Sequence, residues 1–252
     1  METENSVPVI DLQDFPRQLS RLIWACEEWG CFRILNHEVH DNILPVSLMS
    51  EMKKVVRILL DLPTEIKKCN KDVIAGSGYM PLSEKNPLYE ALGLCDMSSP
   101  QDVDAFSTQL GASPHQRETI MKYAAAIHGL MMDIMRKMGE GLGLPNVSFE
   151  DWPCQSRINK YHFNPEADDE SVGGLEVMKK SGEFVAVDPW SNTLLVNLGD
   201  IGTVWSNERV YTVKHRVICK EAKIRVSIAS FLLGPRDTTT TRAGGSRTTP
   251  CL

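Results

Sequence analysis

The sequence lacks the features that mark secreted and membrane proteins. Its seven cysteines include no C-x-x-C pair, and residues 1–8 are polar where a secretory leader needs an apolar stretch. No run approaches the roughly 18 apolar residues that cross a membrane. These absences predict a soluble, cytoplasmic protein with reduced thiols and no membrane partner.

Positive charge is also too dispersed for a nucleic-acid-binding surface. The 252 residues include 27 Lys and Arg against 33 Asp and Glu, and the basic residues form no continuous run. Domains that bind nucleic acid carry a basic patch or stripe, so this balance argues against such a partner. With 42% hydrophobic residues the chain can bury a core. A small-molecule substrate is therefore expected, and the oligomeric state stays open.

Hydrophobic periodicity predicts three helices in the N-terminal part of the chain. Apolar residues recur at helical spacing over residues 14–28, from about 45 to 63, and after Ser113. The third helix has a marked beginning, because Ser113 can be its N-cap and Gln116 the reciprocal partner of a capping box. A long helix from Ser113 follows from this pattern.

After about residue 150 the pattern changes to short β-branched runs separated by turn residues. The expected strands cover residues 157–163, 174–178, 184–187, 193–198, 210–217 and 223–233. They predict an antiparallel sandwich or barrel behind a helical half, and the absence of a flexible linker predicts one compact unit. The Thr-rich stretch at 237–252 has too little apolar surface to fold and is expected to be disordered.

An arginine, a serine and a histidine in the last strands carry the candidate chemistry. Arg225 and Ser227 are two positions apart in a predicted strand, so both side chains point to the same face. The arginine fork beside a hydroxyl suits one carboxylate of a dicarboxylate ligand. A surface pair on an edge strand is the plain alternative. His215 stands ten positions before Arg225, and a lone histidine is more often a packed or solvent-facing residue than a metal ligand.

Together, His215, Arg225 and Ser227 resemble the last iron ligand and the 2-oxoglutarate clamp of the plant iron(II)/2-oxoglutarate-dependent dioxygenases (isopenicillin N synthase-like). Tyr161 stands where that family has a tyrosine that helps to bind 2-oxoglutarate. Residues 197–200 and 205–207 resemble the strands before the last histidine. The resemblance also covers residues 7–12, 29–37 and 157–161. Plant dioxygenases for auxin oxidation are most similar at residues 76–79, 89–94, 158–163 and 230–235.

The resemblance implies an α+β protein whose helical N-terminal half packs on an antiparallel double-stranded β-helix, or jelly roll. Residues 1–150 would be the non-haem dioxygenase N-terminal region and residues 151–236 the jelly-roll domain. The implied activity is 2-oxoglutarate-dependent oxidation of a small plant metabolite, foremost indole-3-acetic acid to 2-oxoindole-3-acetic acid. A gibberellin or a flavonoid is the alternative substrate. Fe(II), 2-oxoglutarate and ascorbate are the implied cofactors.

The sequence departs from the family at the segment that should hold two further iron ligands. The family has a His-x-Asp pair between the strand of Tyr161 and the Gly-Gly-Leu-Glu segment, but here Ala167 runs directly into Asp168. None of the six histidines is followed two positions later by Asp or Glu. The missing piece is roughly twenty residues, or two strands and a turn. The jelly roll is therefore expected to be incomplete, with no assigned catalytic residue.

Two hypotheses on function follow from this departure. The first is a working dioxygenase, for which His162 with Asp168 or Asp169 is the substitute ligand set to test. The second is a non-catalytic or impaired family member that binds at most 2-oxoglutarate or a partner, and the missing ligands favour it. Glu38 and Glu208 also replace turn glycines of the family. Because such glycines often supply a positive φ, both glutamates are expected to strain the backbone.

Overall fold

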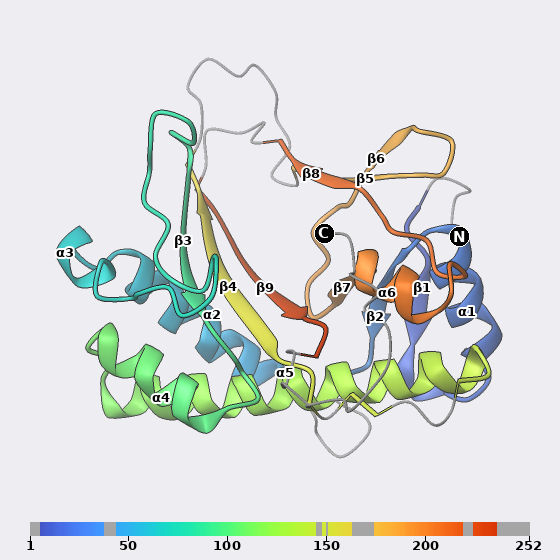
Figure 1. Ribbon diagram of the computed structural model, residues 1–252, viewed down its shortest axis with the longest axis horizontal. Helices are drawn as coiled ribbons and strands as arrows, with labels where there is room; N and C mark the ends of the chain where they lie inside the picture. Colours follow the sequence, from blue (N-terminus) through green and yellow to red (C-terminus); the bar gives the residue numbers. More distant parts are fainter. Residues whose placement is uncertain are drawn as a thin grey trace, which may run out of the picture.

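One long helix and three small β-sheets form the frame of the molecule (Figure 1). The computed structural model describes residues 6–37, 44–144, 148–149, 151–162, 174–218 and 224–235. Helix α5 (Pro114–Gly141) runs along the lower side of the view, and the sheets stand above it. Within the described part of the chain, no helix is long and apolar enough to cross a membrane.

Two of the three predicted helices begin where the sequence indicated. Helix α2 spans Val46–Leu60, and its apolar face is buried at residues such as Met52 and Val56. Helix α5 begins at the predicted capping box. The Gln116 N–H donates to Ser113 Oγ over 3.3 Å, and the Ser113 N–H donates to Gln116 Oε1 over 2.7 Å. Local capping chemistry therefore fixes the start of the helix that underlies the molecule.

Helix α1 (Leu19–Glu28) is shorter than predicted. The expected start at residue 14 is wrong, because a 3₁₀ turn, η1 (Leu12–Asp14), comes first and Pro16 follows it. A proline disfavours the α conformation of the residue before it, so the helix cannot run through this point. Leu22 and Cys26 of α1 are buried as its periodicity indicated.

Several elements of the structure are absent from the prediction. They include β2 (Cys31–Leu35), α3 (Thr64–Lys67), β3 (Tyr89–Leu94), α4 (Pro100–Gln109) and α6 (Asp200–Trp205). Helix α4 had a visible signal, since Ser99 caps it and Pro100 follows at the first helical position. Helix α6 lies between two segments, 197–200 and 205–207, that resembled strands of the family, and the strand suggested at 205–207 is wrong because Trp205 ends this helix. The negative charge of Asp200 in the first turn interacts favourably with the helix dipole. The helix buries none of its residues.

The strands form three sheets of three strands each in the described part of the chain. The sheets have the orders β1-β2-β7, β3-β4-β9 and β6-β5-β8. The remaining strands are β1 (Val9–Asp11), β4 (Cys154–Tyr161), β5 (Leu175–Met178), β6 (Phe184–Ala186), β7 (Leu194–Asn197), β8 (His215–Val217) and β9 (Arg225–Leu232). Because β2 pairs with β7, one sheet joins strands from both halves of the sequence.

Strand β8 is much shorter than the predicted strand at 210–217. The N–H groups of Val210, Tyr211 and Val213 donate to Ser206 Oγ, Cys26 O and Leu198 O, respectively. These amides therefore serve connections to α6, α1 and the end of β7 and are not available for a ladder. Only the last three residues of the predicted strand pair with β5.

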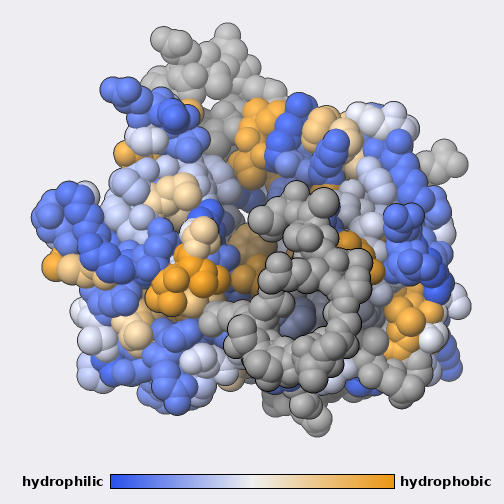
Figure 2. All heavy atoms as spheres, in the orientation of Figure 1, coloured by the Kyte–Doolittle hydropathy of each residue, from blue (hydrophilic) through white to orange (hydrophobic). Residues whose placement is uncertain are grey.

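The apolar core lies between the helices and one face of the sheets. Leu22, Val56, Leu92, Ile120 and Ile158 belong to one buried cluster that includes residues of α1, α2, α5, β3 and β4. Figure 2 shows a mostly hydrophilic face on which hydrophobic residues gather in separate small groups. The helix layer, rather than a closed barrel, supplies most of the buried surface.

Both outer strands of each sheet, β8 and β9 among them, have only one neighbouring strand in the described part of the chain. Strand β9 pairs only with β4, and β8 pairs only with β5. The Leu233 N–H donates to Pro153 O. Along β9, every second amide from Leu233 therefore points toward β4, and the amides between them point away from it. The amides of Val226, Ile228 and Ser230 therefore face the open edge of β9. Among the described residues the sheets do not close into a barrel, which agrees with the incomplete jelly roll expected from the missing segment.

Candidate functional site

The predicted 2-oxoglutarate residues lie together at one end of the β4–β9 ladder. Tyr161 is the register partner of Arg225, and Asn159 is the partner of Ser227. Partners in register share a face, so all four side chains project from the face opposite the helices. Arg225 Nη1 donates to Ser227 Oγ over 3.4 Å, and the Arg225 guanidinium carbon lies 5.2 Å from the centroid of the Tyr161 ring.

Two further residues support this group and were missed by the sequence analysis. The Tyr89 hydroxyl donates to Asn159 Oδ1 over 2.7 Å, and Asn159 Nδ2 donates to Ser227 Oγ over 3.4 Å. The Tyr89 and Tyr161 rings are 5.1 Å apart between centroids. The period-two spacing of Asn159 and Tyr161 could have indicated Asn159. Tyr89 gave no signal, because β3 was not predicted. These contacts orient the Ser227 hydroxyl beside the guanidinium.

All members of this group are at most half-buried, except Asn159, which is buried. A dicarboxylate can therefore reach the arginine from the open side of the sheet. The guanidinium of Arg225 offers two parallel donors to a carboxylate. With a hydroxyl beside it, the group fits one carboxylate of 2-oxoglutarate.

His215 lies in a different sheet from the clamp residues. It is the first residue of β8, faces Val177 of β5 in register, and is exposed. A 2-His-1-carboxylate centre needs three protein ligands on one face of the metal. Among the residues that the structure describes, no three His, Cys, Asp or Glu side chains are arranged to hold a metal ion. The described residues fit 2-oxoglutarate and do not fit iron.

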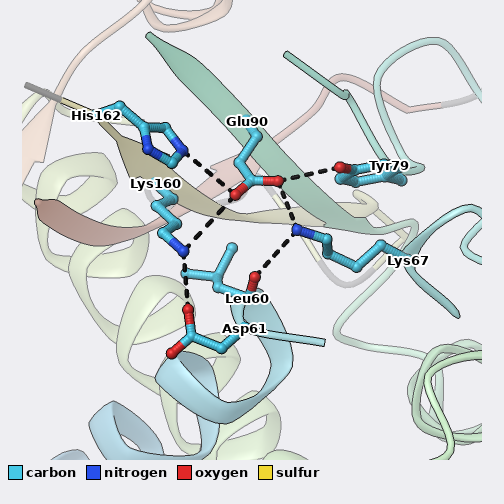
Figure 3. A network of polar contacts seen from close by, with 7 residues as sticks. All are labelled: Leu60, Asp61, Lys67, Tyr79, Glu90, Lys160 and His162. Carbon is cyan, nitrogen blue, oxygen red and sulfur yellow. Dashed lines mark hydrogen bonds and ion pairs between the residues drawn. The ribbon is translucent and has the colours of Figure 1, made fainter. Parts of the chain in front are cut away.

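His162 belongs to a buried ionic cluster on the helix side of the sheet (Figure 3). Its Nε2 lies 3.4 Å from Glu90 Oε1, close enough for an ion pair, but no hydrogen bond forms at that nitrogen. Glu90 Oε2 accepts from Lys67 Nζ over 2.7 Å and from the Tyr79 hydroxyl over 3.0 Å. Lys160 Nζ lies 3.8 Å from Glu90 Oε1. The imidazole is thus directed at a carboxylate that already has partners.

The electrostatics of Glu90 mark this cluster as structural. Burial alone would raise the pKa of Glu90, but the hydrogen bond and charge of Lys67 and the hydroxyl of Tyr79 outweigh it and hold the pKa below its usual value. Burial, and then the contact with Glu90, raises the pKa of Tyr79 to about 12. His162 follows Tyr161, the last residue of β4, and its ring is directed at Glu90. His162 is therefore a poor substitute for an iron ligand, and Asp168 and Asp169 lie outside the described residues.

One of the two glutamates, Glu208, has the left-handed backbone conformation that was expected. Glu208 has φ of 65° and follows Asn207, which has φ of 54°. Both values lie in the left-handed region, which a side chain with a Cβ adopts at a cost of roughly 1–2 kcal/mol. The expected strain at Glu208 is confirmed. Glu38 lies outside the described residues.

Comparisons with known proteins agree with this arrangement. Residues 157–234 match the model of the 2OG-Fe(II) oxygenase superfamily, and residues 7–112 match that of the non-haem dioxygenase in morphine synthesis N-terminal region. The 2-oxoglutarate-dependent dioxygenase DAO of Oryza sativa subsp. japonica is 45% identical over 263 positions, covering 94% of this chain and 86% of the rice protein. The alignment of 263 positions is longer than the chain of 252 residues. The rice protein therefore has residues without a counterpart here.

Solved structures of similar proteins have the same fold. The dioxygenase for auxin oxidation 1 of Arabidopsis thaliana, in a binary complex with 2-oxoglutarate, is 50% identical, with a TM-score of 0.85 over 92% of this chain and 94% of that one. The rice dioxygenase for auxin oxidation is 44% identical, with a TM-score of 0.82 over 92% and 84% of the two chains. The α+β class with a jelly-roll core is thereby confirmed.

Proposed function

Because the chain belongs to the 2OG-Fe(II) oxygenase superfamily, we propose that it binds 2-oxoglutarate through Tyr161, Arg225 and Ser227 but is impaired as a dioxygenase. Fe(II) and 2-oxoglutarate are the cofactor and co-substrate of this superfamily. One observation carries the proposal: the β4–β9 register holds the guanidinium, the hydroxyl and the phenol ring on a single face.

The reaction in which the chain is proposed to be impaired is 2-oxoglutarate-dependent oxidation of a small acid, foremost indole-3-acetic acid to 2-oxoindole-3-acetic acid. The likeness to proteins named for auxin oxidation supports this substrate. A gibberellin or a flavonoid is the second candidate, supported by more distant relatives such as gibberellin 3-beta-dioxygenase 1 of Pisum sativum, which is 27% identical. The 2-oxoglutarate clamp is common to both candidates and does not distinguish between them.

The impairment is proposed because iron lacks its ligands in the described part of the chain. His215 stands alone in its sheet, and His162 faces Glu90 on the other side of β4. The sequence between Tyr161 and Leu175 contains no His-x-Asp pair. Losing a residue that only hydrogen-bonds to a metal ligand commonly weakens metal affinity or activity about 10–100-fold. The loss of two direct ligands is expected to have a larger effect.

Calorimetry of 2-oxoglutarate binding tests the clamp. Arg225→Ala is expected to weaken binding by at least about 10-fold, since a hydrogen bond to a charged group contributes roughly 1.5–3 kcal/mol. Arg225→Lys is expected to recover little, because a point charge lacks the two parallel donors. Arg136→Ala is the matched control, since Arg136 lies on α5 and pairs with Asp133 and Glu140. Equal affinity of the wild type and Arg225→Ala would refute the clamp.

A further inference from the structure

A second arginine lies on the same face of the sheet as the clamp. Arg157 of β4 is two residues from Asn159 and four from Tyr161, so strand alternation places all three side chains on one face. Its register partners are Gly93 of β3 and Ala229 of β9. Both neighbours are small, and the backbone of Ser77 and Gly78 packs where a Cβ on Gly93 would lie.

The guanidinium of Arg157 is held in place by the loop before β3. Its Nε donates to the carbonyl oxygen of Gly76 over 2.9 Å. Gly76 has φ of 78°, and a Cβ at this position would overlap Arg157 Nη2. Glycine therefore serves two purposes here, since it adopts the left-handed backbone and leaves room for the guanidinium. An arginine anchored through Nε presents its two terminal nitrogens as a fixed fork.

This fork has no protein partner among the described residues. Neither terminal nitrogen of Arg157 donates a hydrogen bond to them, and no described carboxylate lies within ion-pair distance. Arg157 is nevertheless half-buried. By contrast, the buried cations Lys67 and Lys137 have carboxylate partners at 2.7 Å. A partly desolvated cation without a counter-ion favours binding of an anion from solution.

The position of Arg157 separates this anion from the 2-oxoglutarate of the clamp. Four residues along a strand span about 13 Å. The carbon chain of 2-oxoglutarate is at most about 6 Å long. The two guanidinium groups are also anchored at different places, Arg157 at the Gly76 carbonyl and Arg225 beside Ser227 and Tyr161. A ligand of Arg157 is therefore a second molecule on the same face.

We propose that Arg157 binds the carboxylate of the substrate, a small organic acid, while Arg225 binds 2-oxoglutarate. This inference rests on the proposed function and adds to it the residue that selects an acid. Asn159 and Ser227 occupy the sheet face between the two arginines. The body of the acid is then directed from Arg157 along the strand toward the co-substrate.

Titration with indole-3-acetate and its neutral analogue indole-3-acetamide tests the assignment. Both ligands are followed by calorimetry in the full chain, with 2-oxoglutarate titrated separately. Arg157→Gln is expected to weaken indole-3-acetate binding about 10- to 100-fold. The variant should leave indole-3-acetamide and 2-oxoglutarate affinities unchanged. Arg157→Lys should recover only part of the loss. Arg136→Gln is the control for removing a positive charge elsewhere.

A second variant moves the guanidinium without removing its charge. Gly76→Ala places a methyl group where Arg157 Nη2 lies, so the side chain must shift. It should weaken indole-3-acetate binding as Arg157→Gln does. Thermal melting of each variant checks that it folds. If Arg157→Gln fails to fold, Gly76→Ala decides the question.

The outcomes separate this inference from the function on which it rests. If the wild type does not bind 2-oxoglutarate, the proposed function fails. If 2-oxoglutarate binds through Arg225 but indole-3-acetate binds the wild type and Arg157→Gln equally, or does not bind at all, the assignment of Arg157 alone is overturned. An equal loss of both ligands in Arg157→Gln would place this arginine in the co-substrate site and would also overturn it.

Discussion

The strands that face the helix layer and the strands beside the missing segment are packed very differently. Strands β2 and β3 bury every residue but one, whereas β7, β9 and α6 bury none of theirs fully. Each of β7, β8 and β9 has a single neighbouring strand in the described part of the chain. A strand needs partners on its edges and on its faces to be buried, and the second region lacks some of both.

The proposed clamp and the proposed loss of the metal site follow this difference in packing. The clamp depends on the β4–β9 register, which eight consecutive pairs fix against a buried helix-facing side. A one-residue slip would turn Ile158 out of the core, so the register is strongly specified. An iron site would join β8 to residues of the missing strands, across a gap that no described strand bridges.

Restoring the missing strands should have the largest effect on this comparison. The purified chain, given Fe(II), ascorbate and 2-oxoglutarate, is expected to retain no stoichiometric iron and to release succinate only at background with indole-3-acetic acid. Insertion of a strand pair containing His-x-Asp between Ala167 and Asp168 should recover iron binding, because it supplies two ligands and pairs the open edges. Metal analysis and succinate assay measure both.

The control for this insertion is the same strand pair with both ligands replaced by alanine. It should restore the strands without the metal. Robust turnover by the unmodified chain, abolished by His215→Ala, would contradict the proposed impairment and would require ligands from outside the described residues.

The ionic cluster on the helix side should be the most sensitive part of the packed region. Lys67 and Glu90 are 8% and 6% exposed and 2.7 Å apart. Lys67→Met leaves the Glu90 carboxylate without its nearest cation, which is expected to cost about 3–5 kcal/mol in the free energy of unfolding. Lys68→Met, which breaks an exposed pair with Glu65 one position along, should cost less than about 1 kcal/mol. Urea denaturation compares the two variants.

Truncation of one apolar side chain in each region should sharpen the contrast. Leu92 of β3 is 0% exposed, and Leu92→Ala is expected to cost about 2–5 kcal/mol through lost burial and the cavity left behind. Phe231 of β9 is 42% exposed, and Phe231→Ala should cost about 1 kcal/mol or less. Equal losses in urea denaturation would show that the two regions are packed alike.

Acid should weaken the packed region through Glu90. Its pKa is lower in the folded protein than in the unfolded chain, so the unfolded state takes up the proton first as the pH falls. The stabilisation is complete above the unfolded pKa of about 4.3 and is lost as the pH falls through the folded value. Urea titrations at successive pH values should show less of this loss in Glu90→Gln. An identical pH dependence in both proteins would exclude Glu90 as its source.

The smallest effect is expected at the turn before β8. Glu208→Gly relieves the left-handed backbone at φ of 65° and should stabilise the protein by about 1 kcal/mol. Glu208→Ala, which keeps the Cβ, is the matched control and should bring no such gain. Thermal melting of both variants distinguishes conformational strain from an effect of the side-chain charge.

The sequence predicted those elements whose signals are local. The capping box at Ser113 and the apolar stripe of α2 depend on residues within one or two turns, and both appear as expected. Strands β5 and β6 differ from their predicted bounds by one residue at one end. Strand β3 and helix α6 gave no clear pattern, because Tyr89 and Glu90 serve contacts to other elements and α6 has no buried face.

The sequence by itself determined the superfamily and the absence of a His-x-Asp pair, and it led to the proposed clamp of Tyr161, Arg225 and Ser227, because each depends on short motifs in the chain. Only the tertiary structure decided that His162 faces Glu90 and that His215 stands in a separate sheet. It also decided that Arg157 shares the clamp face without a described counter-ion. These facts depend on strand register and on loops far apart in the chain, which no local pattern encodes.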